Sequence, residues 1–289
     1  MYLVINADDL GLHPAVQRAV ETCAEAGVVT SATLLANGPY VDSACQTRGV
    51  GLGVHLNVLR GRPLCDPREV PTLLGEKGLF LGRYTKLFWR YLKGELACEE
   101  VEREWSRQIE SLLERGVRPT HLDSEKHVHC WPLLMPIAQT LAKRYGVRWV
   151  RRTVEITRWT CWTAGGLRAR LLRAWSRSHR PVPGVAWPDA VWGVALAGDA
   201  IGPAKLVACL RRLRGARVVE MICHPGDPRP NDPPLAPEFG PLRVRRRWAA
   251  EFRALTSQPW RSALESAGIT LAHYGQASPP ETGSAERET

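Results

Sequence analysis

The chain has 289 residues, of which 44% are hydrophobic and 24% charged, so it can bury a large core as one α/β barrel or as two smaller domains. Its formal charge of +10 at pH 7 comes mostly from arginine. A positive net charge can indicate that a protein binds nucleic acid. No helix-turn-helix, RNP-like strand or zinc knuckle accompanies it, and we expect no nucleic-acid partner.

Strand and helix patterns alternate along the chain. Strands are predicted at 2–5, 28–35, 51–56, 120–123, 147–151, 218–222 and 269–274. Helices are predicted at 14–26, 41–48, 99–115, 133–145, 203–214, 242–256 and 259–267. Repeated strand-then-helix units predict a parallel sheet, and about seven or eight of them predict a barrel. We expect one domain over 1–275, because two domains would have to share a site whose candidate residues are spread along the chain.

Three segments break this alternation. Residues 59–93 form a Gly- and Pro-punctuated insertion, and residues 157–194 are rich in Trp and Arg. On a barrel, insertions of this kind lie near the catalytic face, although the second also fits an ordinary surface helix packed on the barrel. The polar segment 276–289 is expected to be a disordered tail.

The eight cysteines are scattered, with no C-x-x-C pair and no zinc-finger spacing. The chain opens directly on an apolar strand, without a signal peptide, and it contains no long apolar span. These features predict reduced thiols and a cytoplasmic location.

Acidic and histidine side chains recur where the predicted strands end. Asp8 and Asp9 follow the first strand, and His55 ends the third. Asp123 ends the fourth, and His224 follows the strand at 218–222. Because the carboxyl ends of parallel strands meet at one edge of a sheet, we expect these groups to converge. Their types predict a mononuclear metal site with a flanking acid and base.

Five motifs along the chain resemble those of one known family. They are Asn6-Ala7-Asp8-Asp9-Leu10-Gly11, Gly27-Val28-Val29-Thr30-Ser31-Ala32-Thr33, Gly53-Val54-His55-Leu56-Asn57, Thr120-His121-Leu122-Asp123-Ser124 with His127-Val128-His129, and Cys223-His224-Pro225-Gly226. In this order they resemble the YdjC-like carbohydrate deacetylases over nearly the whole chain.

The resemblance implies a distorted (β/α)7–8 barrel, a homodimer and a divalent-metal hydrolase that removes acetyl groups from N-acetylated amino sugars. One branch of the family acts on chitin-type oligosaccharides, and another is associated with hopanoid lipid biosynthesis. The resemblance makes Asp9 and His55 metal ligands. It makes Asp8 the carboxylate that activates the attacking water.

The third metal ligand is where the chain departs from the family. The family usually has His two residues after the Asp of the His-Leu-Asp motif, and this chain has Glu125 there. Glutamate also binds divalent ions, and an anion in place of a neutral ligand would make the site more negative and favour Mg²⁺ or Mn²⁺ over Zn²⁺. Alternatively, His127 or His129 takes the position and Glu125 supports the ligands.

Amide hydrolysis also requires protonation of the leaving amine. His224 is the candidate general acid, or a donor to the oxyanion, although His-Pro-Gly could form only a turn. Four further residues are candidates for orienting the substrate or the catalytic groups: Asp123, Arg151, Arg152 and Glu220.

Two other functions remain open from the sequence. One is an inactive sugar- or lipid-binding homologue, with Glu125 marking the loss of catalysis. The other is a different metal hydrolase, such as a phosphoesterase, although such sites commonly need more carboxylates to bridge two metals.

The substrate could be a soluble oligosaccharide or a lipid-linked amino sugar. Segment 157–194 interleaves arginines with five tryptophans, namely Trp159, Trp162, Trp175, Trp187 and Trp192. A basic helix with Trp on its apolar side suits an anionic membrane, which predicts peripheral contact with the inner membrane face. Aromatic rings also stack on sugars.

Overall fold

A computed structural model describes residues 1–156, 164–195, 201–213, 215–240, 242, 244–257 and 259–277. Its described strands form one parallel sheet in the order β5-β4-β3-β2-β1-β7-β6, and β8 pairs with the start of β1. The strands are β1 (Tyr2–Leu10), β2 (Ser31–Leu34), β3 (Gly51–Leu56), β4 (His121–Ser124), β5 (Trp149–Val150), β6 (Ala190–Trp192), β7 (Val218–Cys223) and β8 (Thr270–Leu271).

The two edges of this sheet meet beyond β5. Val191 of β6 donates its backbone N–H to the carbonyl of Val154 at 2.9 Å, and its own carbonyl accepts from Ile156 at 2.8 Å. A parallel bridge joins Glu155 to the same strand. The expected single α/β domain with a distorted barrel is therefore confirmed.

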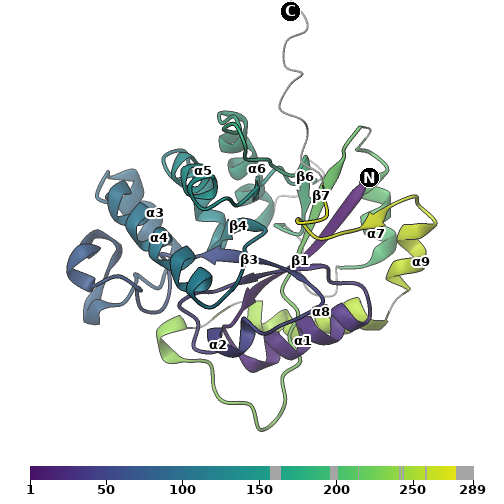
Figure 1. The fold of residues 1–289 in the computed structure, drawn as a ribbon, viewed down its shortest axis with the longest axis horizontal. Coiled ribbons are helices and arrows are strands. Elements are labelled where there is room, and N and C mark those ends of the chain that lie inside the picture. Colours follow the sequence, from purple (N-terminus) through teal and green to yellow (C-terminus); the bar gives the residue numbers. More distant parts are fainter. Residues whose placement is uncertain are drawn as a thin grey trace, which may run out of the picture.

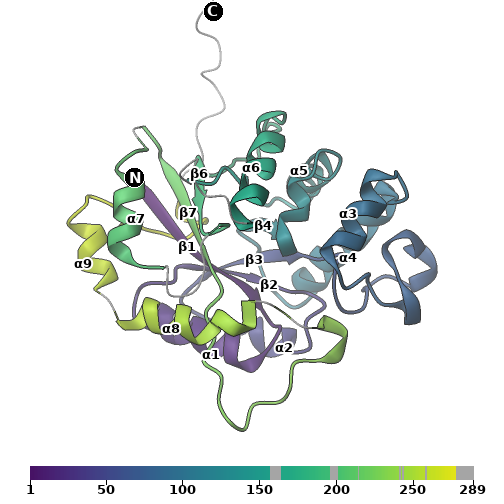
Figure 2. The same cartoon turned by 180° about the vertical axis from the view of Figure 1, so that it is seen from behind.

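Helices cover the outside of the barrel (Figures 1 and 2). Both views show α1, α2 and α8 along one side of the sheet, α3 to α6 along another, and α7 with α9 beyond β7. Their bounds are α1 (Pro14–Glu25), α2 (Val41–Ala44), α3 (Tyr84–Leu92), α4 (Cys98–Glu114), α5 (Met135–Arg144), α6 (Ala164–Arg177), α7 (Pro203–Leu210), α8 (Trp248–Ser257) and α9 (Trp260–Glu265). None of the helices in the described ranges is long and apolar enough to cross a membrane.

Local chemistry fixes the ends of these elements. The ring of His13 accepts a hydrogen bond from the N–H of Ala15 and caps α1, whose first residue is Pro14. The helix is followed by Gly27 with a positive φ of 68°, as a glycine stop requires. On β3, a Cβ on Gly53 would lie 2.3 Å from the ring of His121, so only glycine lets that ring fill the barrel interior.

The segments outside the regular alternation differ from expectation in detail. The 59–93 insertion folds into short 3-10 turns followed by α3. Within 157–194, residues 157–163 lie outside the described part, and the remainder supplies α6 and the sheet strand β6, so this segment belongs to the barrel itself. Of the expected tail, Ala277 is buried, and residues 278–289 are not among those described.

Candidate active site

The two acidic residues on β1 lie at a distortion of the strand. The strand continues to Leu10, beyond its predicted end, and its register with β2 shifts between Ala7 and Leu10. Asp9 within the shifted stretch has a φ of 69°, which is costly for a residue other than glycine. Neighbouring strand residues normally face opposite sides of a sheet. The distortion instead lets both carboxylates approach His55.

Arg151, which follows β5, is the centre of a buried charge cluster. Its guanidinium donates to both oxygens of Asp8 at 2.9 and 2.7 Å, and its Nη2 lies 2.7 Å from Asp123 Oδ2. Its Nε donates to both oxygens of Glu220 at 2.9 and 3.0 Å, and the hydroxyl of Tyr274 donates to the same carboxylate at 2.7 Å. The buried guanidinium of Arg151 therefore forms ion pairs with three buried carboxylates.

This cluster sets the protonation of its members. Burial by itself would raise the pKa of Asp8, but the charge and hydrogen bonds of Arg151 hold that pKa well below its ordinary value. For Asp123 and Glu220, burial outweighs the attraction of Arg151 and raises the pKa. Asp8 is consequently the member that stays ionised most firmly, and in this environment it is a weak base.

His55 on β3 lies between two carboxylates. Its Nδ1 is 2.7 Å from Asp123 Oδ1, and its Nε2 is 3.4 Å from Asp9 Oδ1. Burial opposes a positive charge on this ring, but Asp123, Asp8 and Asp9 raise the pKa of His55 to about 9. Surroundings that favour a proton on Nε2 also favour a metal cation there.

The geometry around Nε2 fits a metal ligand. Two protein donors on one tetrahedral ion, with bonds of about 2.0–2.1 Å, are about 3.3 Å apart, which is close to the separation of Asp9 Oδ1 and His55 Nε2. Asp123 fixes the other ring nitrogen, which is the usual arrangement behind a metal-bound imidazole. Carboxylates outnumber arginines here by five to two, and this excess favours a bound cation; these groups are Asp8, Asp9, Asp123, Glu125, Glu220, Arg60 and Arg151.

A second group of possible ligands overlaps this pair. Asp8, His55 and Asp123 have donor atoms that all lie within 4.8 Å of one another, and they are the single such group found in the described ranges. Arg151, however, binds both oxygens of Asp8 and one oxygen of Asp123. An ion between those two carboxylates would have to displace the guanidinium. A position between His55 Nε2 and Asp9 leaves the guanidinium in place.

The three candidates for a third ligand follow β4 in the 3-10 segment η4 (Glu125–Cys130). Glu125 Oε1 accepts from Arg60 Nε at 2.7 Å, and both side chains are nearly buried. His129 uses both ring nitrogens, one with the Ser124 hydroxyl and one with the carbonyl of Arg151. The Nδ1 of His127 is buried and has no hydrogen-bond partner in the part of the chain that is described.

The backbone of η4 is strained at this point. Lys126 and His127 have φ angles of 54° and 58°. Together with Asp9, three of the four non-glycine residues with positive φ in the described ranges lie beside candidate ligands. Strain of this kind persists where the surrounding structure requires it, and it is typical of functional sites.

His224 follows β7 at the margin of the cluster. Its Nε2 lies 3.8 Å from Asp8 Oδ2, and its side chain is 20% exposed, whereas that of Asp8 is only 2% exposed. Its backbone N–H donates to Glu251 at 2.6 Å. A histidine placed in this way can exchange protons with solvent and with a group bound beside Asp8.

One expected orienting residue does not reach the site. Arg151 points into the barrel, whereas Arg152, the next residue, places its guanidinium 4.9 Å from the ring centre of Trp187. Successive residues of an extended chain face opposite sides, which accounts for the difference. Arg152 is therefore a packing contact of Trp187.

Several residues of the site were not among the sequence candidates. Thr33 donates to Asp123 Oδ2 at 3.1 Å, and Asn6 donates to Asp8 at 2.8 Å. Both belong to the ordered motifs, and that signal could have found them. Arg60 and Tyr274 belong to none of the motifs, and no sequence signal singles them out.

The sequence comparisons identify the family of the chain. The family model described as YdjC-like protein matches residues 2–266. The chain belongs to the YdjC-like family. This confirms the resemblance carried by the five motifs, whose residues surround His55 and Arg151.

Curated relatives carry deacetylase names. A carbohydrate deacetylase of Geobacillus stearothermophilus is 31% identical over 94% of this chain and 96% of its own length. A chitooligosaccharide deacetylase of Escherichia fergusonii is 30% identical over 77% of this chain and 81% of its own length. A carbohydrate deacetylase of Halalkalibacterium halodurans is 38% identical, over only half of this chain and 61% of its own length.

A solved structure has the same fold. It is described as a putative cellobiose-phosphate cleavage protein of Enterococcus faecalis, and it superposes with a TM-score of 0.70 at 28% identity. The match covers 95% of this chain and 97% of that protein. That protein and this chain therefore share one fold over nearly their whole lengths.

Proposed function

We propose that this protein is a metal-dependent hydrolase that removes the N-acetyl group of an N-acetylated amino sugar and releases acetate. The observation that carries the proposal is the position of His55, fixed by Asp123 on one ring nitrogen and facing Asp9 with the other. The deacetylase names of the relatives support the sugar amide as the bond that is cleaved.

Asp9 and His55 would hold the metal, with Glu125 or His127 as the third protein ligand. Glu125 keeps one carboxylate oxygen outside its pair with Arg60, and the unpartnered Nδ1 of His127 is the alternative donor. The ring nitrogens of His129 are both engaged, which makes it the weakest candidate. When bound, a Zn²⁺, Mg²⁺ or Mn²⁺ ion supplies an acidified water and polarises the acetyl oxygen.

The protein's own groups move the protons. Asp8 is positioned to orient the attacking water and to accept its proton. Because Arg151 keeps Asp8 a weak base, the proton does not remain there. His224, 3.8 Å from Asp8 Oδ2, receives it and delivers it to the departing amine. Glu220 and Tyr274 hold Arg151, and thereby Asp8, in place.

An inactive homologue is the less favoured function. A site that had lost catalysis would no longer need the buried carboxylates of Asp8, Asp123 and Glu220. Burying each of these charges carries a desolvation penalty that lowers the stability of the fold. All three are present and bind Arg151. The third candidate, a two-metal phosphoesterase, has less support, because one guanidinium already binds these carboxylates.

The direct experiment measures acetate release from N,N′-diacetylchitobiose, an N-acetylglucosaminyl lipid and an N-acetylated nucleotide sugar. Metal-stripped protein is assayed alone and after addition of Zn²⁺, Mg²⁺ or Mn²⁺. Activity with at least one substrate should depend on added metal.

His55→Gln should abolish both activity and metal retention. His273→Gln is the matched control, because His273 lies against Gly51 at the opposite end of β3. Activity that is unchanged after metal removal, or that survives in His55→Gln, would refute the proposal.

A further inference from the structure

Exposed hydrophobic side chains gather on one face of the molecule. Seven large hydrophobic residues are exposed in the described part of the chain, and five of them lie on α3, on α6 or on the turn before α5. These five are Trp89, Leu92, Leu133, Leu167 and Leu171. Trp89 is 61% exposed and Leu167 is 63% exposed, and exposed hydrophobic side chains that gather on one face mark interaction surfaces.

The elements that carry these five residues pack against one another. The rings of Phe88 and Tyr91 on α3 pack on buried Trp131 at 5.5 and 4.8 Å, and Phe88 also lies 6.2 Å from Trp175 on α6. The hydroxyl of Tyr91 accepts from the N–H of Leu133 at 3.3 Å. We call the surface formed by α3, residues 131–134 and α6 the α3–α6 face.

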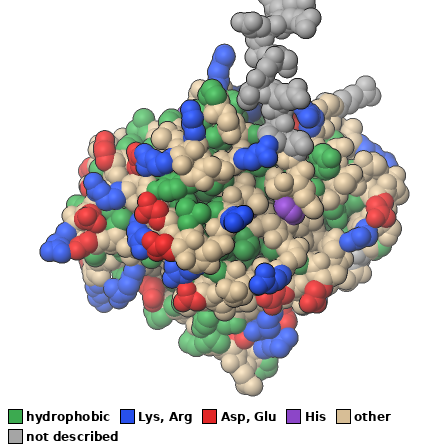
Figure 3. All heavy atoms as spheres, in the orientation of Figure 1, with side chains coloured by type: hydrophobic (Ala, Val, Ile, Leu, Met, Phe, Trp, Pro, Cys, Tyr) green, Lys and Arg blue, Asp and Glu red, His purple; other side chains and the backbone are tan. Residues whose placement is uncertain are grey.

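The α3–α6 face is also basic. Neither α3 nor α6 contains an acidic residue, and from Lys126 to Pro188 the only one is Glu155, which is buried. The basic residues on the two helices are Lys86, Arg90, Arg168, Arg170, Arg173 and Arg177. In Figure 3, Lys and Arg side chains stand among hydrophobic ones over the upper part of the molecule, where Figure 1 shows α5 and α6.

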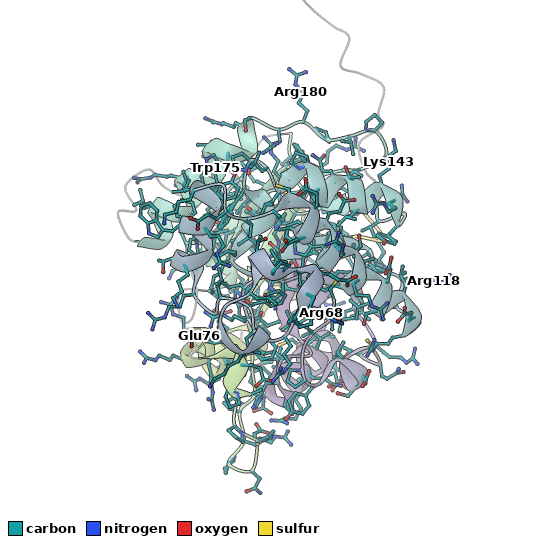
Figure 4. The ribbon with its side chains drawn as sticks, turned by 90° about the vertical axis from the view of Figure 1, so that its left-hand side faces the viewer. Arg68, Glu76, Arg118, Lys143, Trp175 and Arg180 are labelled. Carbon is teal, nitrogen blue, oxygen red and sulfur yellow. The ribbon has the colours of Figure 1, made fainter. Side chains whose placement is uncertain are left out.

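A groove opens beside the most exposed aromatic ring of this face. It has a volume of about 840 Å³ and is lined by Trp89, Lys86 and Arg90 on α3. The facing wall is the 75–81 part of the insertion. Glu76 and Glu95 are the acidic residues that line the groove. Figure 4 looks at this end of the molecule and shows Trp175 on the same side as Glu76, with Arg180 projecting outward above. The groove is large enough for a phosphate-bearing lipid headgroup.

We propose that the α3–α6 face binds the surface of an anionic membrane. Exposed Trp and Leu side chains insert at the boundary between headgroups and acyl chains, and the surrounding Lys and Arg side chains attract anionic headgroups. The charge also argues against a second copy as the occupant. A two-fold interface would place the same basic surface on both sides, and the like charges would repel.

The residues that form this surface differ from those expected from the sequence. Trp187 and Trp192 are buried, and Trp159 and Trp162 lie outside the described residues. Trp175 is only partly buried and takes part. The remaining aromatic exposure comes from α3, in the other insertion, so that two segments far apart in the sequence make one surface.

This surface adjoins the proposed active site through the chain itself. Trp131, on which the aromatic residues of α3 pack, directly follows η4, the segment that carries Glu125 and His127. Bound by the α3–α6 face, the protein would hold that loop near the membrane. The inference does not depend on the proposed reaction, because membrane binding is measured without turnover.

The test is co-sedimentation of the full-length protein with vesicles of phosphatidylcholine alone and of equal parts phosphatidylcholine and phosphatidylglycerol. Binding is expected only to the anionic vesicles and should weaken as salt increases. The double variant Trp89→Glu, Leu167→Glu should bind at least about tenfold more weakly, because it removes two inserting side chains and adds like charge.

Leu113→Glu is the matched control, because Leu113 is an exposed leucine on α4, away from this face. It should bind as the wild type does. Circular dichroism verifies that the variants fold, and light scattering of the free protein reports its oligomeric state. Absence of binding to anionic vesicles at low salt, equal loss in the control, or a dimer that the double variant dissociates would overturn the proposal.

Discussion

Glu155 provides a stability prediction that is independent of the proposed reaction. Its side chain is buried where the barrel closes, and its carboxylate accepts the backbone N–H groups of Gly193 at 3.1 Å and Val194 at 2.9 Å. Burial raises the pKa of Glu155 from 4.5 to about 7, although these hydrogen bonds oppose the shift. We expect replacement by Gln to remove one pH-dependent contribution to stability.

The sign follows from the two protonation states. Between pH 4.5 and about 7, folded Glu155 keeps a proton that the unfolded chain has already released. Raising the pH through this window therefore favours the unfolded state, and the penalty is complete above the folded pKa. The rise of this pKa from 4.5 to about 7 corresponds to about 3 kcal/mol of unfolding free energy.

The assay is urea unfolding of wild type and Glu155→Gln, followed by circular dichroism from about pH 4 to about pH 8. Glutamine does not titrate, so the difference between the two proteins isolates Glu155. The variant loses a hydrogen-bond acceptor, which is a constant offset of about 1 kcal/mol. Across the window it should gain about 3 kcal/mol relative to wild type. A difference that does not change with pH would refute the reasoning.

Three further predictions concern the site. Arg151→Met should lower the free energy of unfolding by about 3–5 kcal/mol, because it leaves three buried carboxylates without their cation. A loss below about 1 kcal/mol in urea unfolding would contradict this. Asp8→Asn should retain metal, measured by mass spectrometry, but lower turnover by about 10²–10⁴-fold; near-normal turnover would assign proton acceptance elsewhere. Glu125→Ala should weaken metal binding by at least about tenfold and more than His127→Ala does, and the reverse order would make His127 the ligand.

Most of the barrel could be predicted from local patterns. The strand predicted at 51–56 is β3, and α1 begins at the predicted Pro14 and ends just before the glycine that was expected to stop it. Barrel strands are short apolar runs and their helices end at glycine, so both leave a local signal. β6 leaves none, because it has three residues and its pairing with 154–156 depends on closure of the whole sheet.

The site could be predicted as a set of residues but not as a set of contacts. The motifs place Asp8, Asp9 and His55 at strand ends, and parallel strands bring those ends together. Which carboxylate faces the ring and which faces Arg151 depends on the distortion at Asp9, which the sequence does not reveal. Arg60 reaches Glu125 from an insertion, and Tyr274 reaches Glu220 from beyond the last strand, so only the three-dimensional fold determines their proximity.

The contact between Arg60 and Glu125 changes the expected effect of having Glu125 where the family usually has a histidine. An anion in place of the usual histidine was expected to make the site more negative and to favour Mg²⁺ or Mn²⁺. Glu125, however, shares its charge with Arg60 at 2.7 Å in nearly buried surroundings. The pair as a unit is neutral, as a histidine would be, and Arg60 is fixed further by donating to the carbonyl of Phe239 at 2.8 Å. The substitution therefore gives no reason by itself to expect a weaker Lewis acid or to exclude Zn²⁺.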